Sequence, residues 1–281
     1  MSQYTRETEK LQKVLARAGL GSRREIEQWI KDRRVRVDDR LAEIGDRVHE
    51  GNVIRLDGRV VNIKPSAEFR RRVVIYNKPN GEICSRKDPE NRPTVFDNLP
   101  NLYQGRWLSV GRLDINTSGL LLFTNDGELA NKLMHPSTEI ERHYAVRVHG
   151  DIKPIHIQNL RKGVQLEDGI AKFDSLSASG GEGTNQLFKV ALKEGRNREV
   201  RRMWESQELE VSRLIRIQYG PIKLPRTLPR GVWSELDDHD VNELARLAGL
   251  QPKNIERRMV YTKKVRQRRI LTKRRQNNRR P

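Results

Sequence analysis

The sequence predicts an α+β protein with two domains and a basic C-terminal tail. Three observations predict it: helical apolar spacing followed by short strands near the N-terminus, a charged segment at 64–72, and a β-rich region after it. A chain of 281 residues can hold one medium and one small domain. We therefore expect a small domain at 1–63, a linker at 64–72, a larger domain at 73–250 and a tail at 251–281.

Two helices and a small sheet are expected in the N-terminal domain. The first helix has apolar residues at i, i+3, i+4 and i+7: Leu11, Val14, Leu15 and Ala18. Ser22 and Glu25 have the spacing of a capping box that begins a second helix. Arg23 and Arg24 lie in its first turn, where the helix dipole disfavours cations, so an anion such as phosphate would compensate them. Short strands are expected at 35–37, 53–56 and 60–63, the last two joined by an Asp57-Gly58 turn.

The net charge of +19 is concentrated in the tail. Residues 253–281 contain 13 Lys and Arg against one acid, Glu256, whereas residues 65–252 contain 28 against 25. Such an excess indicates a polyanionic partner, of which nucleic acid is the commonest, and predicts a tail that is disordered until it binds. The alternative is a charged surface that serves solubility alone.

Cysteine content and hydropathy indicate a soluble protein of the cytoplasm. Cys84 is the only cysteine, so no intrachain disulfide can form, and we expect a small buried apolar residue rather than a nucleophile. The N-terminus is polar and lacks the apolar core of a signal peptide, and no apolar run has membrane-spanning length.

The most informative stretch is 111–127. The apolar run from Leu120 to Phe123 predicts a strand buried on both faces. Asn125 and Glu128 have capping-box spacing for a helix that ends at Met134. Before the strand, a polar loop contains Asp114, and a carboxylate at the end of a rigid strand is suited to nucleophilic or base chemistry. Spacing alone favours the alternative, in which this carboxylate only caps a turn.

The second half of the larger domain predicts further strands and one basic helix. Tyr144 alternates with apolar residues in the expected strand at 142–149. Another strand is expected at 186–193, preceded by a hairpin at Gly180–Gly183 that lacks the pattern of a phosphate loop. Asn197 would cap a helix with a predominantly basic face and a buried apolar face, the basic face containing Arg198, Arg201, Arg202 and Glu205.

No metal or cofactor is predicted. The acidic run Asp237–Asp240 precedes an expected helix at 241–247 and is typical of N-cap and first-turn residues. No pair of His or Cys has the spacing of metal ligands.

The motifs resemble one enzyme family. Gly-Arg-Leu-Asp at 111–114, followed by Thr-Ser-Gly-Leu-Leu-Leu-Phe-Thr at 117–124 and Asp-Gly at 126–127, is similar to the catalytic motif of RNA pseudouridine synthases. Asn77–Gly81 and Glu194–Met203 resemble the first and third motifs of that family. Lys10–Gly19, with Gly21–Arg24 and Gly45–Val48, resembles the S4 RNA-binding domain that one branch of the family carries.

The resemblance implies an S4 domain followed by a synthase domain with a mixed, mainly antiparallel sheet and flanking helices. It implies isomerisation of uridine to pseudouridine in ribosomal RNA without a cofactor, with Asp114 as nucleophile or base. Tyr144 would stack on the target base, and Arg201 would form an ion pair with Asp114, with Arg198 as the substitute candidate. Arg112 would fill the space that the flipped base leaves, and the S4 domain would bind RNA through Arg17, Arg23 and Arg24.

Within the family, the segment 163–183 resembles the bacterial synthases that act on 23S ribosomal RNA. The expected partner is therefore large-subunit ribosomal RNA, bound by a monomer and without a membrane. Two alternatives stay open: a synthase for another ribosomal uridine, and a non-catalytic RNA-binding assembly protein.

Overall fold

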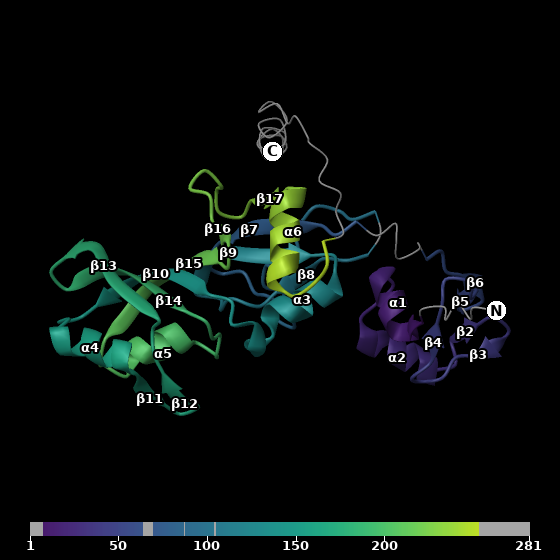
Figure 1. Ribbon diagram of the computed structural model, residues 1–281, viewed down its shortest axis with the longest axis horizontal. Coiled ribbons are helices and arrows are strands. Elements are labelled where there is room, and N and C mark those ends of the chain that lie inside the picture. The colour runs from purple at the N-terminus through teal and green to yellow at the C-terminus, as the bar shows by residue number, and fades with distance from the viewer. Residues whose placement is uncertain (1–7, 64–69, 87, 104, 253–281) are drawn as a thin grey trace.

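The computed structural model describes residues 8–63, 70–86, 88–103 and 105–252. Most of the expected linker and nearly all of the expected tail lie outside these residues. The N-terminal domain lies at one end of an elongated molecule, and the larger domain forms the rest (Figure 1). Within the described residues, no helix combines the length and the apolar character that crossing a membrane requires.

The N-terminal domain packs two helices against short strands. Its elements are β1 (Glu9–Lys10), α1 (Leu11–Arg17), α2 (Arg23–Lys31), β2 (Val35–Val37), β3 (Arg40–Leu41), β4 (Arg47–Val48), β5 (Ile54–Leu56) and β6 (Arg59–Val60). The sheet has the order β3-β2-β5-β6, and β1 pairs with β4. The predicted capping box of α2 is confirmed, because Ser22 Oγ accepts from Glu25 N at 3.1 Å while Glu25 Oε2 accepts from Ser22 N at 2.7 Å. The predicted 57–58 turn joins β5 to β6.

A nine-stranded sheet forms the larger domain. The strands are β7 (Val73–Lys78), β8 (Leu108–Val110), β9 (Thr117–Thr124), β10 (Arg142–His149), β13 (Ser175–Glu182), β14 (Asn185–Leu192), β15 (Glu210–Tyr219), β16 (Ile222–Lys223) and β17 (Trp233–Glu235). The main order is β13-β14-β10-β15-β9-β7-β17, with β8 beside β9 and β16 beside β15. Among the described strands of this sheet, β9 and β15 alone pair in parallel, which confirms the mixed, mainly antiparallel sheet.

Helices cover the two halves of this sheet separately. Helices α4 (Pro154–Lys162) and α5 (Glu199–Glu205) lie on the half that contains β10 and β14, with the hairpin β11 (Val164–Leu166) and β12 (Gly169–Ala171) (Figure 1). Helices α3 (Gly127–Met134) and α6 (Asp238–Leu247) cover the half that contains β7 and β9, and a short 3₁₀ turn, Pro136–Thr138, follows α3. The two halves have separate apolar cores. Strand β9 lies where they meet, and all its residues are buried, as its apolar run predicts.

Two predicted helix caps are wrong by one residue. The N-cap of α3 is Asp126, whose carboxylate accepts from Glu128 N at 2.9 Å, and Asn125 instead accepts from Arg72 N at 2.8 Å. The N-cap of α5 is Arg198 at φ +48°, not Asn197. Asn125 does not cap its own helix because its side chain bonds the segment just before β7 instead.

Candidate active site

Asp114 lies in the loop that joins β8 to β9 (residues 111–116), called the catalytic loop here after the role expected of Asp114. A buried lysine holds the backbone of this loop. Lys78, at the end of β7, is fully buried. Its Nζ donates to the carbonyl oxygens of Pro79 at 3.0 Å, Asp114 at 3.1 Å and Thr117 at 2.9 Å, with Ile115 at 3.4 Å. Burial lowers the pKa of Lys78, an effect opposed by nearby acidic groups that include the Asp114 carboxylate. The ammonium thus fixes the loop that presents the half-buried Asp114.

Arg201 approaches the same loop from α5. Its guanidinium donates to Val211 O at 2.6 Å and to Asn116 O at 2.9 Å, and its Nε is buried without a partner among the described residues. Burial lowers the pKa of Arg201, and the charge of Asp114 opposes this shift. The expected direct ion pair between them is not formed, since no Arg201–Asp114 contact within 4.0 Å occurs in the described part of the chain. Arg201 instead directs its two terminal nitrogens to the backbone carbonyls of Val211 and Asn116, which hold the guanidinium on the loop backbone and not on the carboxylate.

The substitute candidate, Arg198, lies elsewhere. It is exposed at the start of α5, where its guanidinium forms an ion pair with Glu205 at 3.2 Å. Of the two arginines, Arg201 is the one that the fold brings to the catalytic loop.

A second buried arginine, Arg216 on β15, was not singled out from the sequence. Its Nε donates to Leu120 O at 2.8 Å, and its Nη2 is buried without a partner among the described residues. In the sheet it stands opposite Tyr144 of β10 and Gly119 of β9. Gly119 has φ +101°, and a Cβ there would lie 2.3 Å from Arg216 O, so only glycine lets the parallel strands approach this closely.

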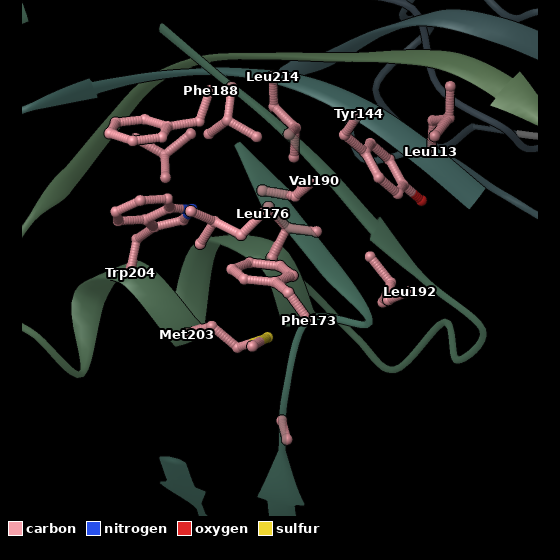
Figure 2. Close-up of a cluster of buried hydrophobic side chains, with 14 of the residues drawn as sticks. Leu113, Tyr144, Phe173, Leu176, Phe188, Val190, Leu192, Met203, Trp204 and Leu214 are labelled. Atoms are coloured by element: carbon pink, nitrogen blue, oxygen red, sulfur yellow. The ribbon is translucent and has the colours of Figure 1, made fainter. Parts of the chain in front are cut away.

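Tyr144 lies at the end of the apolar cluster nearest the catalytic loop. Figure 2 shows its ring beside Leu113, away from the Trp204–Phe188 end of the cluster. The ring is 8% exposed, and the hydroxyl has no hydrogen-bond partner among the described residues, contrary to the expected polar contact.

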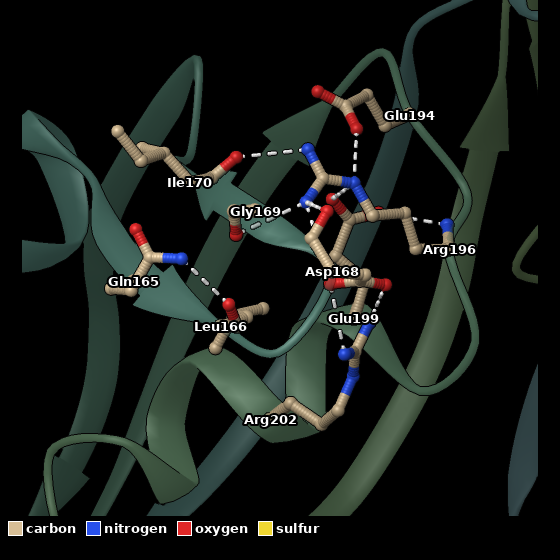
Figure 3. Close-up of polar contacts among 9 residues, drawn as sticks. All are labelled: Gln165, Leu166, Asp168, Gly169, Ile170, Glu194, Arg196, Glu199 and Arg202. Atoms are coloured by element: carbon tan, nitrogen blue, oxygen red, sulfur yellow. Dashed lines mark hydrogen bonds and ion pairs between the residues drawn. The ribbon is translucent and has the colours of Figure 1, made fainter.

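A polar network on the surface attaches the β11–β12 hairpin to α5 (Figure 3). Arg202 donates to both carboxylate oxygens of Asp168, at 3.0 and 2.8 Å. Arg196 donates to Ile170 O at 2.8 Å and to Glu194 at 2.5 Å. The hydrogen bonds from Arg202 lower the pKa of Asp168. The arginines of the third motif therefore divide into a buried one that reaches the catalytic loop and outer ones that hold the helix.

Cys84 lies against the catalytic loop and is half-buried, so it is less buried than the expected small buried residue. Its Sγ contacts Leu113 O at 3.3 Å and Leu113 N at 3.4 Å. Burial raises the pKa of the Cys84 thiol, which agrees with the expectation that it is no activated nucleophile.

The expected RNA-binding arginines differ in their surroundings. Arg112 is exposed on the catalytic loop, and Arg23 and Arg24 are exposed on α2. Arg17 instead forms an ion pair with Glu9, which also binds Lys13 at 2.8 Å. This pairing reduces the availability of Arg17 for a phosphate.

The acidic run at 237–240 begins α6, as predicted. Asp237 is the N-cap and accepts from Asp240 N at 3.0 Å. The side chains of Asp237, His239 and Asp240 also bring potential ligand atoms within 4.8 Å of one another, a grouping that exposed acids commonly form without an ion.

Fold and site together define a two-domain protein, in which a small α+β domain precedes a larger sheet domain that holds one loop aspartate beside buried cations. Residues 72–206 match the family model described as RNA pseudouridylate synthase, and residues 9–54 match the S4 domain. The chain belongs to the pseudouridine synthase family, in the branch that carries an N-terminal S4 domain.

Individual relatives support this assignment. The chain is 59% identical over 259 residues to ribosomal large subunit pseudouridine synthase B of Pasteurella multocida, covering 92% of this chain and 75% of that protein. It is 59% identical over 247 residues to the protein of the same name from Escherichia coli strain K12, covering 87% and 85%. A solved structure described as a pseudouridylate synthase superposes with a TM-score of 0.58 at 21% identity, covering 84% of this chain and 99% of that one, which shows the shared fold.

Proposed function

We propose that this chain isomerises one uridine of 23S ribosomal RNA to pseudouridine. The observation that supports the site is the position of Asp114 on a loop whose carbonyls accept hydrogen bonds from buried cations. Support for the substrate comes from relatives that are 59% identical and are named for the ribosomal large subunit.

The reaction breaks the bond between uracil N1 and ribose C1′, turns the base, and joins C5 to C1′. C5 loses its proton, and N1, which carries no proton while it is bonded to the ribose, gains one, so atoms and electrons balance without an oxidant, a reductant or a nucleotide. Asp114 acts as the nucleophile at C1′ or as the base that removes a ribose proton. In both cases the carboxylate acts in its ionised form, next to the positive charges of Lys78 and Arg201.

The target base must leave its stack, at a cost of about a few kcal/mol. Arg112, exposed on the catalytic loop, is proposed to occupy the vacated space. Tyr144 is proposed to stack on the extruded base, an interaction worth about 1–3 kcal/mol. Arg23 and Arg24 are proposed to hold RNA phosphates.

We further propose that the enzyme acts as a monomer in the cytoplasm, without metal or cofactor. We also propose that the chain is divided into an RNA-binding domain at 1–63, a linker at 64–72, a catalytic domain at 73–250 and a basic tail at 251–281.

Mapping of pseudouridine in a 23S ribosomal RNA transcript incubated with purified protein tests the proposal. We expect product at one uridine with the wild type and none with Asp114→Asn. Asp151→Asn is the matched control, because that carboxylate is 83% exposed and lies outside the catalytic loop. Pseudouridine formation by Asp114→Asn would contradict the proposal. So would a wild type that forms no pseudouridine on naked 23S ribosomal RNA, on ribosomal precursors or on small-subunit RNA.

A further inference from the structure

The two domains contact each other through glycines. A Cβ on Gly19, in the turn that ends α1, would lie 2.9 Å from the backbone of Gly105 in the larger domain. A Cβ on Gly105 would lie 3.1 Å from Arg17 O. Both glycines have positive φ, +90° and +83°. The turn after α1 therefore rests directly on the segment that precedes β8, and this segment contains Arg106.

Three arginines lie near this contact, where the charge of Arg23 acts on Arg106 and the charge of Arg106 acts on Arg86. Arg23 begins α2, shortly after the turn at Gly19, and Arg106 follows Gly105. Arg86 donates to the carbonyl oxygen of Trp107, the neighbour of Arg106, and its guanidinium lies 4.1 Å from the ring centroid of Phe96. Side chains from both domains thus carry positive charge along one junction.

The three arginines lack a direct ion-pair partner in the described part of the chain. None of the three forms an ion pair within 4.0 Å among the residues that the structure describes. Burial lowers the pKa of Arg106, the negative charge of Glu25 raises it and the positive charge of Arg23 lowers it, while burial and Arg106 lower the pKa of Arg86. The carboxylate of Glu25 also accepts from Ser22 N in the capping box and offsets part of the charge of Arg106, but Glu25 is one acid beside three cations. Placing these like charges together costs free energy that a bound anion would offset.

The same segment also exposes an aromatic ring. The side chain of Tyr103 is 97% exposed, three positions before Arg106. Exposed aromatic rings beside arginines are typical of surfaces that bind single-stranded or looped RNA, where bases stack while cations hold phosphates.

We infer that Arg23, Arg86 and Arg106 form one phosphate-binding surface across the domain junction, which holds the RNA backbone outside the target loop. The inference rests on the proposed function for the identity of the RNA. The surface fixes the distance between the RNA held by the N-terminal domain and the uridine presented to Asp114.

Binding of a 23S ribosomal RNA transcript to the full chain, measured at several KCl concentrations, tests the inference. Each phosphate contact contributes about 0.7–0.9 to the slope of log affinity against log salt, so replacing all three arginines by Gln lowers the slope by about 2–3. The matched control replaces by Gln three exposed cations away from the junction, on strands β10, β14 and β16: Arg147, Lys189 and Lys223. Equal slopes for the two triple variants would overturn the inference.

A pair of glycine variants tests the junction itself. Gly19→Ala and Gly58→Ala both place alanine at positive φ, but only the first has an atom of the other domain within 4 Å. We expect Gly19→Ala to bind the transcript about threefold more weakly than Gly58→Ala, because the surface is no longer preorganised. Equal affinities, with thermal unfolding showing both variants folded, would refute a surface shared between domains.

These binding results are independent of turnover. A lower salt slope in the triple arginine variant, together with a wild type that forms no pseudouridine, would support the phosphate-binding surface and reject the proposed function. Pseudouridine formation by the wild type, together with an unchanged salt slope in the variant, would support the proposed function and reject the surface.

Discussion

Lys78→Met removes the ammonium that holds the catalytic loop while keeping the length of the side chain. Lys78 is fully buried, and its Nζ donates to four carbonyl oxygens at 2.9 to 3.4 Å. Three of these carbonyls belong to the segment 114–117, on which Asp114 depends for its position. Methionine fills the space without a donor, so the variant separates the charge and hydrogen bonds from packing.

The expected loss of stability follows from the orphaned carbonyls. A buried acceptor that loses its donor costs about 1–3 kcal/mol. The costs of the four carbonyls add up, but the variant also removes a buried charge. Removing that charge stabilises the folded protein by about several kcal/mol and offsets part of the loss. We expect a net loss of about 3 kcal/mol in the free energy of unfolding. For a protein of this size that corresponds to a Tm lowered by about 6–12 °C, from about 2–4 °C per kcal/mol.

The activity of Lys78→Met should fall more than its stability suggests. A displacement of about 1 Å at a reacting group costs about a hundredfold in rate. Single-turnover formation of pseudouridine at a temperature where the variant is folded measures this loss, and calorimetry measures the Tm. Lys189→Met, on an exposed position of β14, is the control and should match the wild type. A Lys78→Met protein with wild-type Tm and rate would refute the proposed role of the ammonium.

Three other predictions follow from the same region. Arg201→Lys keeps the charge but cannot reach both Val211 O and Asn116 O, so kcat should fall about tenfold or more in single-turnover assays; a loss seen only in Arg198→Lys would transfer the role to Arg198. Burial raises the pKa of Glu82 above its ordinary 4.5, so the protonated carboxyl is favoured in the folded state. Its stabilising contribution is complete below pH 4.5 and is lost as pH rises through the raised value. The wild type should therefore lose stability relative to Glu82→Gln as pH rises through that range in denaturant titrations, and a constant difference would contradict this. Gly119→Ala should lower the free energy of unfolding by about 3 kcal/mol or more, because its Cβ would lie 2.3 Å from Arg216 O. Gly111→Ala, with positive φ but no atom within 4 Å, should cost only about 1–2 kcal/mol, and equal losses would refute the steric argument.

Sequence patterns predicted the elements whose signals are local. The apolar run at 120–123, the alternation around Tyr144 and the capping box at Ser22 each depend on neighbours in the chain, and the structure has each element. Strand β8 was missed because its three residues pair only with β9 and carry no periodic signal of their own. The predicted N-cap at Asn125 was wrong because the side chain of Asn125 accepts from Arg72 N, just before β7, and not from its own helix. Interactions distant in sequence decided both cases.

The surroundings of Asp114 were harder to predict than Asp114 itself. Lys78 stood in the motif at 77–81, yet nothing in that string indicates that its ammonium reaches residues 114–117. A cation at the end of the otherwise apolar run Val73–Tyr76 was the available signal. The prediction of a direct ion pair between Arg201 and Asp114 was wrong, because a sequence motif indicates which residues lie close together but not which of their atoms interact.

Three buried cations from three different strands or helices converge on one short backbone segment. Lys78 donates to the carbonyls of Asp114 and Thr117, Arg201 to that of Asn116, and Arg216 to that of Leu120. Carbonyl oxygens carry only partial charge, so each cation keeps much of its field, which extends to the adjacent carboxylate. Because the carbonyls and not the carboxylate accept the hydrogen bonds, the oxygens of Asp114 stay available for the role that we propose at the ribose. A direct ion pair would occupy the reacting atoms, whereas this arrangement supplies positive charge and rigidity and leaves them unobstructed.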